Sequence, residues 1–145
     1  VQILDPATGT GTFLAEVIKH VQKGFKGQAG IWNSYIQEHL IPRLNGFELL
    51  MASYAMAHLK LDLLLRATGY NQKTNDRLRV YLTNSLEESH QDTGTLFANW
   101  LSREANEANR IKRDTPIMCV IGNPPYSGIS SNNGIDLVLQ WIDVF

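Results

Sequence analysis

Cysteine, histidine clusters and long apolar runs are what this sequence has little of. Its 145 residues include one cysteine, Cys119, and four histidines that are widely scattered along the chain. A single thiol excludes a disulfide framework, and scattered histidines propose no metal site. No stretch is long and apolar enough to cross a bilayer, and no signal-peptide pattern begins the chain. We therefore expect a cytoplasmic protein with no metal and no membrane partner.

An excess of positive charge is also missing. The chain carries 13 basic and 14 acidic residues, a formal net charge of −1, whereas a protein that grips nucleic acid by itself is usually basic. If DNA is a partner, most of the contacts with its phosphates must come from elsewhere. With 43% hydrophobic and 19% charged residues, the chain can bury a core, and its length predicts one domain.

A short apolar run near the C-terminal end leads into a proline-rich turn. Residues 117–121 predict a strand buried on both faces, which ends at Gly122. Pro124 and Pro125 then forbid both a helix and a continued strand ladder. In open parallel sheets ligands bind at the carboxyl ends of strands, so this turn is a candidate site. An ordinary surface turn is the alternative, because Asn-Pro and Pro-Pro are common in loops.

The turn carries an amide, backbone carbonyls and an aromatic ring, which suit one chemical problem. An exocyclic amino group on a nucleobase is a poor nucleophile because its lone pair is delocalised into the ring. The side-chain oxygen of Asn123 and the carbonyl of Pro124 could accept its two hydrogens, which favours a pyramidal nitrogen with a localised lone pair. Tyr126 could stack on the base and hold it flat, and Pro125 would fix the turn.

At the other end of the chain, residues 3–14 read as a strand, a glycine-rich turn and the start of a helix. Gly9 and Gly11 allow a sharp turn and a close approach of a ligand to the backbone. The helix that follows offers unpaired N–H groups and the positive end of its dipole. Asp5, which ends the strand, is well placed for a ligand ammonium or hydroxyl. Leu14 stands where a dinucleotide fingerprint has its third glycine, which disfavours a dinucleotide site.

Together the two segments resemble the adenine-N6 DNA methyltransferases of restriction–modification systems. D-P-A-T-G-T-G-T-F-L at residues 5–14 is similar to their D-P-x-x-G-x-G-x-F cofactor loop, and N-P-P-Y at residues 123–126 is similar to their catalytic loop. The order of the two motifs is that of the γ arrangement. The resemblance implies S-adenosylmethionine as the cofactor, bound at Asp5, Ala7, Gly9 and Gly11.

Two further cofactor contacts are implied by the same resemblance. Glu48 ends the predicted strand over residues 43–49, and the matching acid of the family binds the cofactor ribose; a solvated glutamate is the alternative. Asn84 follows the predicted strand over residues 78–83. Relatives commonly have aspartate there, as an acceptor for the cofactor adenine, and asparagine keeps an acceptor oxygen without the charge. For Asn84 the alternative is a simple turn cap.

Four strand-like runs separated by helices predict a parallel α/β sheet with right-handed crossovers. The resemblance makes this the Rossmann-like fold of S-adenosylmethionine-dependent methyltransferases, a partial sheet with strand order 3-2-1-4 flanked by helices. Helical periodicity is found at residues 13–24, 31–41, 50–68, 96–113 and 135–145. The predicted core face of the helix over 50–68 comprises Ala52, Ala55, Met56, Leu59, Leu63 and Leu64. The charged residues 103–113 are expected to face solvent.

The implied reaction is direct methyl transfer to N6 of a flipped-out adenine, with no metal and no covalent enzyme intermediate. Residues 1–145 would form a partial catalytic core that lacks the target-recognition domain. Double-stranded DNA would be held mainly by other parts of a parent chain, which could include restriction or helicase domains. Two alternatives stay open: methylation of a protein glutamine amide, and a non-catalytic cofactor-binding fragment. The glutamine enzymes share N-P-P-Y but lack the equivalents of Pro6 and Phe13.

Overall fold

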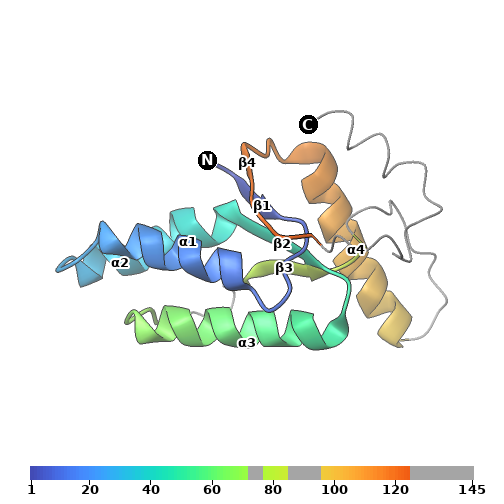
Figure 1. Ribbon diagram of the computed structural model, residues 1–145, viewed down its shortest axis with the longest axis horizontal. Helices are drawn as coiled ribbons and strands as arrows, with labels where there is room; N and C mark the ends of the chain where they lie inside the picture. The colour runs from blue at the N-terminus through green and yellow to red at the C-terminus, as the bar shows by residue number, and fades with distance from the viewer. Residues whose placement is uncertain (72–76, 85–95, 125–145) are drawn as a thin grey trace.

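The computed structural model of the chain describes residues 1–71, 77–84 and 96–124. Within these residues four parallel strands form one sheet in the order β3-β2-β1-β4 (Figure 1). The strands are β1 (Ile3–Asp5), β2 (Leu44–Glu48), β3 (Arg79–Leu82) and β4 (Cys119–Val120). The strand order and the parallel pairing confirm the predicted fold class. Because all four strands run the same way, their carboxyl ends meet at one edge of the sheet.

Helices alternate with the strands along the chain. They are α1 (Thr12–Lys23), α2 (Ala29–Tyr35), the π turn η1 (Ile36–Leu40), the 3-10 turn η2 (Ile41–Arg43), α3 (Met51–Ala67) and α4 (Leu96–Asp114). The helix predicted over residues 31–41 was expected to end before Pro42. Instead Pro42 lies in the first turn of η2, where a missing backbone N–H breaks no helical hydrogen bond.

The helices cover the sheet from two sides. Leu14 of α1 and Leu61 of α3 belong to a buried cluster that includes Val80 of β3. Tyr81, the next residue of β3, belongs to a second cluster with Ile111 of α4. Successive residues of a strand point to opposite faces, so α1 and α3 cover one face and α4 covers the other (Figure 1).

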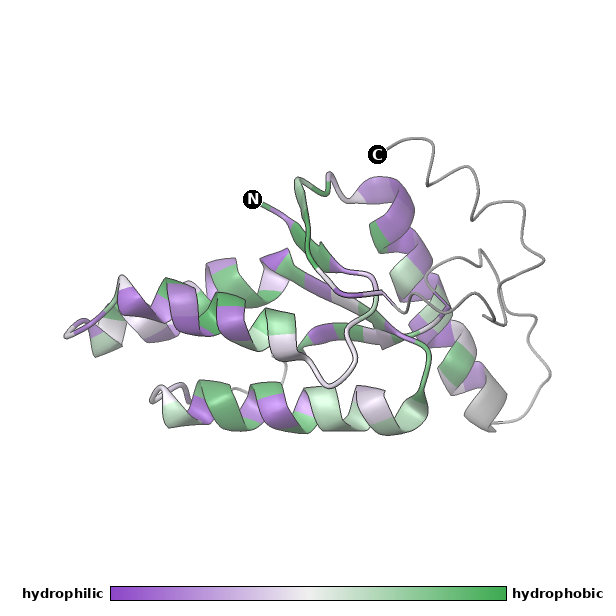
Figure 2. Cartoon of the chain, in the orientation of Figure 1, coloured by the Kyte–Doolittle hydropathy of each residue, from purple (hydrophilic) through white to green (hydrophobic). Residues whose placement is uncertain are grey.

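The predicted core face of α3 is wrong. The residues that α3 buries are Ala57, Leu61 and Leu65. Of the predicted set, the exposed members are Ala52, Ala55, Met56, Leu59 and Leu63, and only Leu64 packs against the core. Hydrophobic residues run along the whole of α3 (Figure 2), so the pattern does not single out one face, and contact with α1 and the sheet selects it. Even so, none of the described helices is long and apolar enough to cross a membrane.

The predicted burial of the last strand is also wrong. Val120 is 54% exposed and Met118, just before β4, is 71% exposed. Within the described residues β4 pairs with β1 alone, so its other edge has no strand against it there. An apolar run indicates a strand covered on both faces only where layers lie on both sides, and the described residues supply too few neighbours for that. The helix predicted over residues 135–145 lies outside the described residues.

Candidate active site

The sequence-predicted site residues gather at the carboxyl edge of the sheet. Asp5 ends β1, Glu48 ends β2, and Asn84 and Asn123 lie shortly after β3 and β4. These strand ends share one edge because the sheet is parallel throughout. Since β1 lies between β2 and β4, Asp5 is at the centre of the edge, with Glu48 on one side and the turn of Asn123 on the other.

The turn after β1 is bound down onto the neighbouring strand. The N–H of Thr8 donates to the carbonyl of Phe47 in β2 (2.9 Å), and the Thr8 hydroxyl donates to the carbonyl of Asp5 (3.1 Å). Gly9 and Gly11 have φ angles of 55° and 78°, in the left-handed region that favours glycine. Gly11 is the residue before α1, so the turn ends at the N-terminus of a helix, where N–H groups and the helix dipole attract acceptors.

Glu48 is a partner of this turn and not a solvated acid. Its exposed fraction is 9%. One carboxylate oxygen accepts a hydrogen bond from the N–H of Gly9 (2.7 Å), and the other accepts one from the N–H of Leu50 (2.8 Å). Each oxygen has a second lone pair, so the carboxylate can still accept hydrogen bonds from a ligand hydroxyl. The solvated alternative is therefore wrong, and ribose binding stays a prediction.

Asp5 is fully buried and only half of its carboxylate is paired. Its exposed fraction is 0%. Oδ1 accepts a hydrogen bond from the N–H of Ala7 (3.2 Å), whereas Oδ2 has no partner among the described residues. Burial raises the pKa of Asp5 to about 6; the Ala7 hydrogen bond opposes this rise and the negative charge of Glu48 adds to it. A buried, unpaired carboxylate oxygen is costly, and it fits a ligand that brings a donor or a positive charge.

A lysine of α4 helps to hold Asn84 in place. The exposed fraction of Asn84 is 8%. Its backbone carbonyl accepts hydrogen bonds from Nζ of Lys112 (3.0 Å) and from the hydroxyl of Thr83 (3.3 Å). The Lys112 ammonium also lies 5.5 Å from the centroid of the Phe47 ring, at the range of a cation–π contact. These contacts hold the backbone of Asn84 at the end of β3. Binding of the cofactor's adenine by the Asn84 side chain stays a prediction, with a turn cap as the alternative.

The two motif loops, at opposite ends of the sequence, meet where Gly122 lies against Asp5. The chain after β4 continues beside β1, since the N–H of Ile121 donates to the carbonyl of Leu4 (2.9 Å). A Cβ placed on Gly122 would lie 2.8 Å from Oδ1 of Asp5. Asn123 and Pro124 follow directly and are exposed. The other two residues predicted for the catalytic turn, Pro125 and Tyr126, lie outside the described residues.

Sequence patterns missed the side chains that close the outer edge of β3. Glu104 of α4 is 1% exposed; it accepts a hydrogen bond from the N–H of Leu82 (3.2 Å) and pairs with Arg77. On the other side, His58 of α3 places Nε2 3.1 Å from a β3 carbonyl, so this nitrogen carries the proton. Burial lowers the pKa of His58, which favours the neutral ring. The expectation that residues 103–113 face solvent is wrong for one side of this segment. Glu104 meets the edge strand, and Ala105, Ala108, Asn109 and Ile111 are buried as well.

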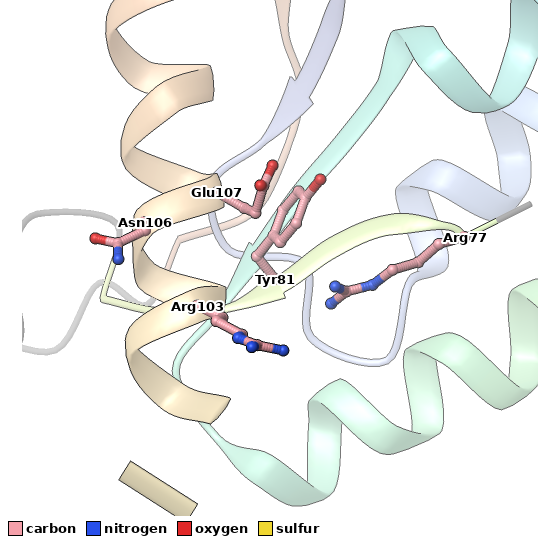
Figure 3. Close-up of a pocket in the computed structure, with 5 residues that line it drawn as sticks. All are labelled: Arg77, Tyr81, Arg103, Asn106 and Glu107. Atoms are coloured by element: carbon pink, nitrogen blue, oxygen red, sulfur yellow. The ribbon is translucent and has the colours of Figure 1, made fainter. Parts of the chain in front are cut away.

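A separate hollow of about 470 Å³ lies between β3 and α4. Its lining residues are Arg77, Tyr81, Arg103, Asn106 and Glu107 (Figure 3). The Arg77 guanidinium lies over the Tyr81 ring, 5.2 Å from the ring centroid. None of the residues predicted to bind or react lines this hollow. The candidate site is therefore the edge of the sheet and not this hollow.

The sequence of the chain matches a known family over nearly its whole length. The profile of the family described as N-6 DNA Methylase matches residues 1–141. No curated protein is a significant match.

Three solved structures share the fold of the chain. The ATP-dependent Type ISP restriction-modification enzyme LlaBIII bound to DNA is 24% identical, with a TM-score of 0.69 over 99% of this chain and 10% of that one. A nuclease-deletion mutant of the Type ISP restriction-modification enzyme LlaGI, in complex with a DNA substrate mimic, is 23% identical. Its TM-score is 0.65, over 88% of this chain and 10% of that one. The DrdV–DNA complex is 28% identical, with a TM-score of 0.59 over 92% and 11%. The chain thus spans about a tenth of the length of these proteins.

Proposed function

The chain belongs to the N-6 DNA Methylase family, and on that premise we propose that it is the catalytic core of an adenine-specific DNA methyltransferase. The methyl group passes from S-adenosylmethionine to N6 of an adenine, within a restriction–modification system. The observation that carries this proposal is the contact between Asp5 and Gly122, which puts the glycine-rich loop beside the turn of Asn123. In this proposal residues 1–145 are a partial core, and a longer polypeptide supplies the rest of the enzyme.

The residues at the sheet edge fit the chemical groups of S-adenosylmethionine. Oδ2 of Asp5, buried and without a partner, suits the ammonium group of the cofactor. Glu48 keeps lone pairs for the ribose hydroxyls while it holds Gly9. The amide oxygen of Asn84 would accept a hydrogen bond from the cofactor's adenine. The backbone that the cofactor approaches closely is that of Ala7, Gly9 and Gly11. When bound, the cofactor supplies an electrophilic methyl group on a sulfonium.

The reacting side of the site is the turn after β4. The Asn123 side-chain oxygen and the Pro124 carbonyl accept the two hydrogens of the adenine amino group, and this localises the lone pair on N6. With the cofactor bound, that lone pair would be free to form an N–C bond to its methyl carbon, and the electrons of the broken S–C bond would stay on sulfur. The surplus N6 proton then leaves to water. Tyr126 stacks on the flipped base, so catalysis is mainly a matter of positioning.

Double-stranded DNA is held mainly outside this chain. The net charge of −1 leaves little electrostatic attraction for a polyanion. The chain is about a tenth as long as the solved structures it resembles, two of which are bound to DNA or a DNA mimic and belong to Type ISP enzymes. We therefore place target recognition, and restriction or helicase activities, in other parts of the same cytoplasmic polypeptide.

Labelled cofactor tests the proposal. The full-length enzyme that contains this chain is incubated with methyl-labelled S-adenosylmethionine and duplex DNA, and the DNA is digested to nucleosides. We expect the label in N6-methyl-2′-deoxyadenosine, and none when the adenines of the DNA are methylated beforehand. A release factor with its glutamine exposed serves as the competing substrate in a parallel reaction. Label on that glutamine, or on cytosine, would overturn the assignment to adenine.

A further inference from the structure

Gly122 has no room for a side chain, although its backbone would accept one. Its φ lies outside the left-handed region, so an L-residue would not be strained there. A Cβ would nevertheless lie 2.8 Å from Oδ1 of Asp5, a distance that real Cβ atoms essentially never show. The next nearest atom, Cδ of Pro6, is at an ordinary 3.5 Å. The demand for glycine therefore comes from one carboxylate oxygen.

The two sides of this contact are held with different firmness. Asp5 is fully buried, lies in the strand between β2 and β4, and accepts a hydrogen bond from the N–H of Ala7. Residues 122–124 are exposed and follow β4, which pairs with β1 alone in the described part of the chain. An added Cβ would therefore displace residues 122–124 and leave Asp5 in place. Asn123 is the next residue, so its amide moves with them.

We propose that Gly122 is a positioning residue for methyl transfer, because its missing side chain lets Asp5 set the place of Asn123 relative to the cofactor loop. This inference rests on the proposed function. The Cβ must withdraw by several tenths of an ångström to reach ordinary contact with Asp5. In-line transfer tolerates little error, and a misplacement of about 1 Å costs about 100-fold in rate. Gly122→Ala should therefore slow the transfer step about tenfold and leave cofactor affinity nearly unchanged.

Gly46 supplies an internal comparison, because it touches the same loop from the other side. A Cβ there would lie 2.5 Å from Oγ1 of Thr8, 3.1 Å from Cδ1 of Leu14 and 3.3 Å from Cγ2 of Val80. Gly46 is buried in β2, between β1 and β3, so neither its backbone nor Val80 can easily give way. The added carbon pushes on the cofactor loop at Thr8 and does not reach Asn123. Gly46→Ala should therefore weaken cofactor binding first.

The test uses three matched glycine-to-alanine variants of the full-length enzyme. They are Gly122→Ala, Gly46→Ala and, as the control, Gly30→Ala in α2, where no atom lies within 4 Å of the added Cβ. Cofactor affinity is measured by calorimetry, and the transfer rate is measured in single turnover at saturating cofactor and DNA. We expect Gly122→Ala to lose rate, Gly46→Ala to lose affinity and Gly30→Ala to lose neither. Equal losses of rate and affinity in Gly122→Ala would indicate partial unfolding and overturn the positioning role, as would no loss at all.

A second measurement keeps the contact testable if Gly122→Ala folds poorly. Its effect on the free energy of urea unfolding is compared in the unsubstituted and Asp5→Ala backgrounds. If Oδ1 of Asp5 is the obstacle, Gly122→Ala destabilises the unsubstituted protein but not the Asp5→Ala variant. An equal loss of stability in the two backgrounds would rule the contact out. The unsubstituted enzyme separates the two hypotheses. If it methylates adenine while Gly122→Ala behaves like Gly30→Ala, only the inference on Gly122 fails, whereas an inactive unsubstituted enzyme removes the proposed function.

Discussion

The cofactor loop over residues 5–9 and the turn over residues 121–124 lie side by side but are held differently. Backbone and side-chain hydrogen bonds to β2 hold the loop, and its acid is buried. The turn is tied to β1 through the N–H of Ile121 and is exposed from Gly122 onward. The chain thus organises the side that would bind the methyl donor more firmly than the side that would hold the base. Substitutions in the loop should therefore cost cofactor affinity, whereas substitutions in the turn should cost rate.

Asn123→Ala should have the largest effect and separates the turn from the loop most clearly. In the proposed mechanism the side chain of Asn123 accepts a hydrogen of the adenine amino group, and removing one such preorganised group should cost about 100- to 1,000-fold in rate. Asn123 is exposed and outside the loop, so cofactor affinity should not change. Single-turnover kinetics and calorimetry on the full-length enzyme measure the two quantities. Asn106→Ala, at an exposed site on α4, is the control. A fall in cofactor affinity as large as the fall in rate would show that the two regions are not separate.

Asp5→Asn tests the loop through its dependence on pH. Burial raises the pKa of Asp5 to about 6 in the folded chain, from an ordinary value of 3.8, so the folded state holds the proton more tightly than the unfolded state. Stability from this group is therefore present below pH 4 and is lost as pH rises towards 6. The loss is up to about 3 kcal/mol, since each pKa unit is about 1.4 kcal/mol. Asp5→Asn should abolish this pH dependence, and it should weaken cofactor binding.

Urea unfolding between pH 4 and pH 8 measures this effect. Above pH 6 we expect Asp5→Asn to be more stable than the unsubstituted protein, because the buried negative charge is gone. Asp114→Asn, at an exposed position on α4, should leave the pH profile as it is. A profile for the unsubstituted protein that is flat between pH 4 and pH 6 would contradict the raised pKa.

Glu48→Gln should have the next largest effect. The carboxylate accepts hydrogen bonds from the N–H groups of Gly9 and Leu50, and a glutamine has only one oxygen for the two. An unpaired buried N–H costs about 2 kcal/mol of stability, and the cofactor loop should loosen with it. Urea unfolding measures the loss of stability, and calorimetry measures the cofactor affinity that depends on the loop. Glu38→Gln, at an exposed site, is the matched control, and an equal effect in both variants would refute the role of Glu48 in holding the loop.

Val120→Thr is the smallest expected change. Val120 is 54% exposed, so a hydroxyl there meets water and the loss of stability should stay below about 0.5 kcal/mol. The same substitution at Val80, which is 1% exposed, buries a hydroxyl and should cost about 1–3 kcal/mol. Thermal unfolding of both variants gives the comparison. A large loss at Val120 would mean that β4 is held more firmly than its exposure indicates.

Local patterns were sufficient for the strand ends and for the turn after β1. The acids Asp5 and Glu48 end β1 and β2, and both glycines of the turn adopt the positive φ that the pattern predicts. Backbone sterics decide such features within a few residues, so a sequence shows them directly. The order of the strands came instead from the resemblance to a family, and the structure agrees with it.

Patterns failed where the partner comes from elsewhere in the chain. α3 is hydrophobic around most of its circumference, and only α1 and the sheet decide that Leu61 turns inward and Leu59 outward. Glu104 looks like its charged neighbours on α4, yet its carboxylate accepts a hydrogen bond from the N–H of Leu82 in β3. The apolar run before Gly122 reads as a covered strand, although in the described chain β4 pairs only with β1.

The amino-acid sequence by itself determined where the chain turns, where the strands end and which chemical groups stand at those ends, because glycine, proline and short apolar runs act on their own neighbourhood. Only the tertiary structure decided that Asp5 and Gly122 would touch and that Glu48 would hold Gly9. Those contacts join atoms from distant segments, and their distances exist only once the parallel sheet has brought the segments together.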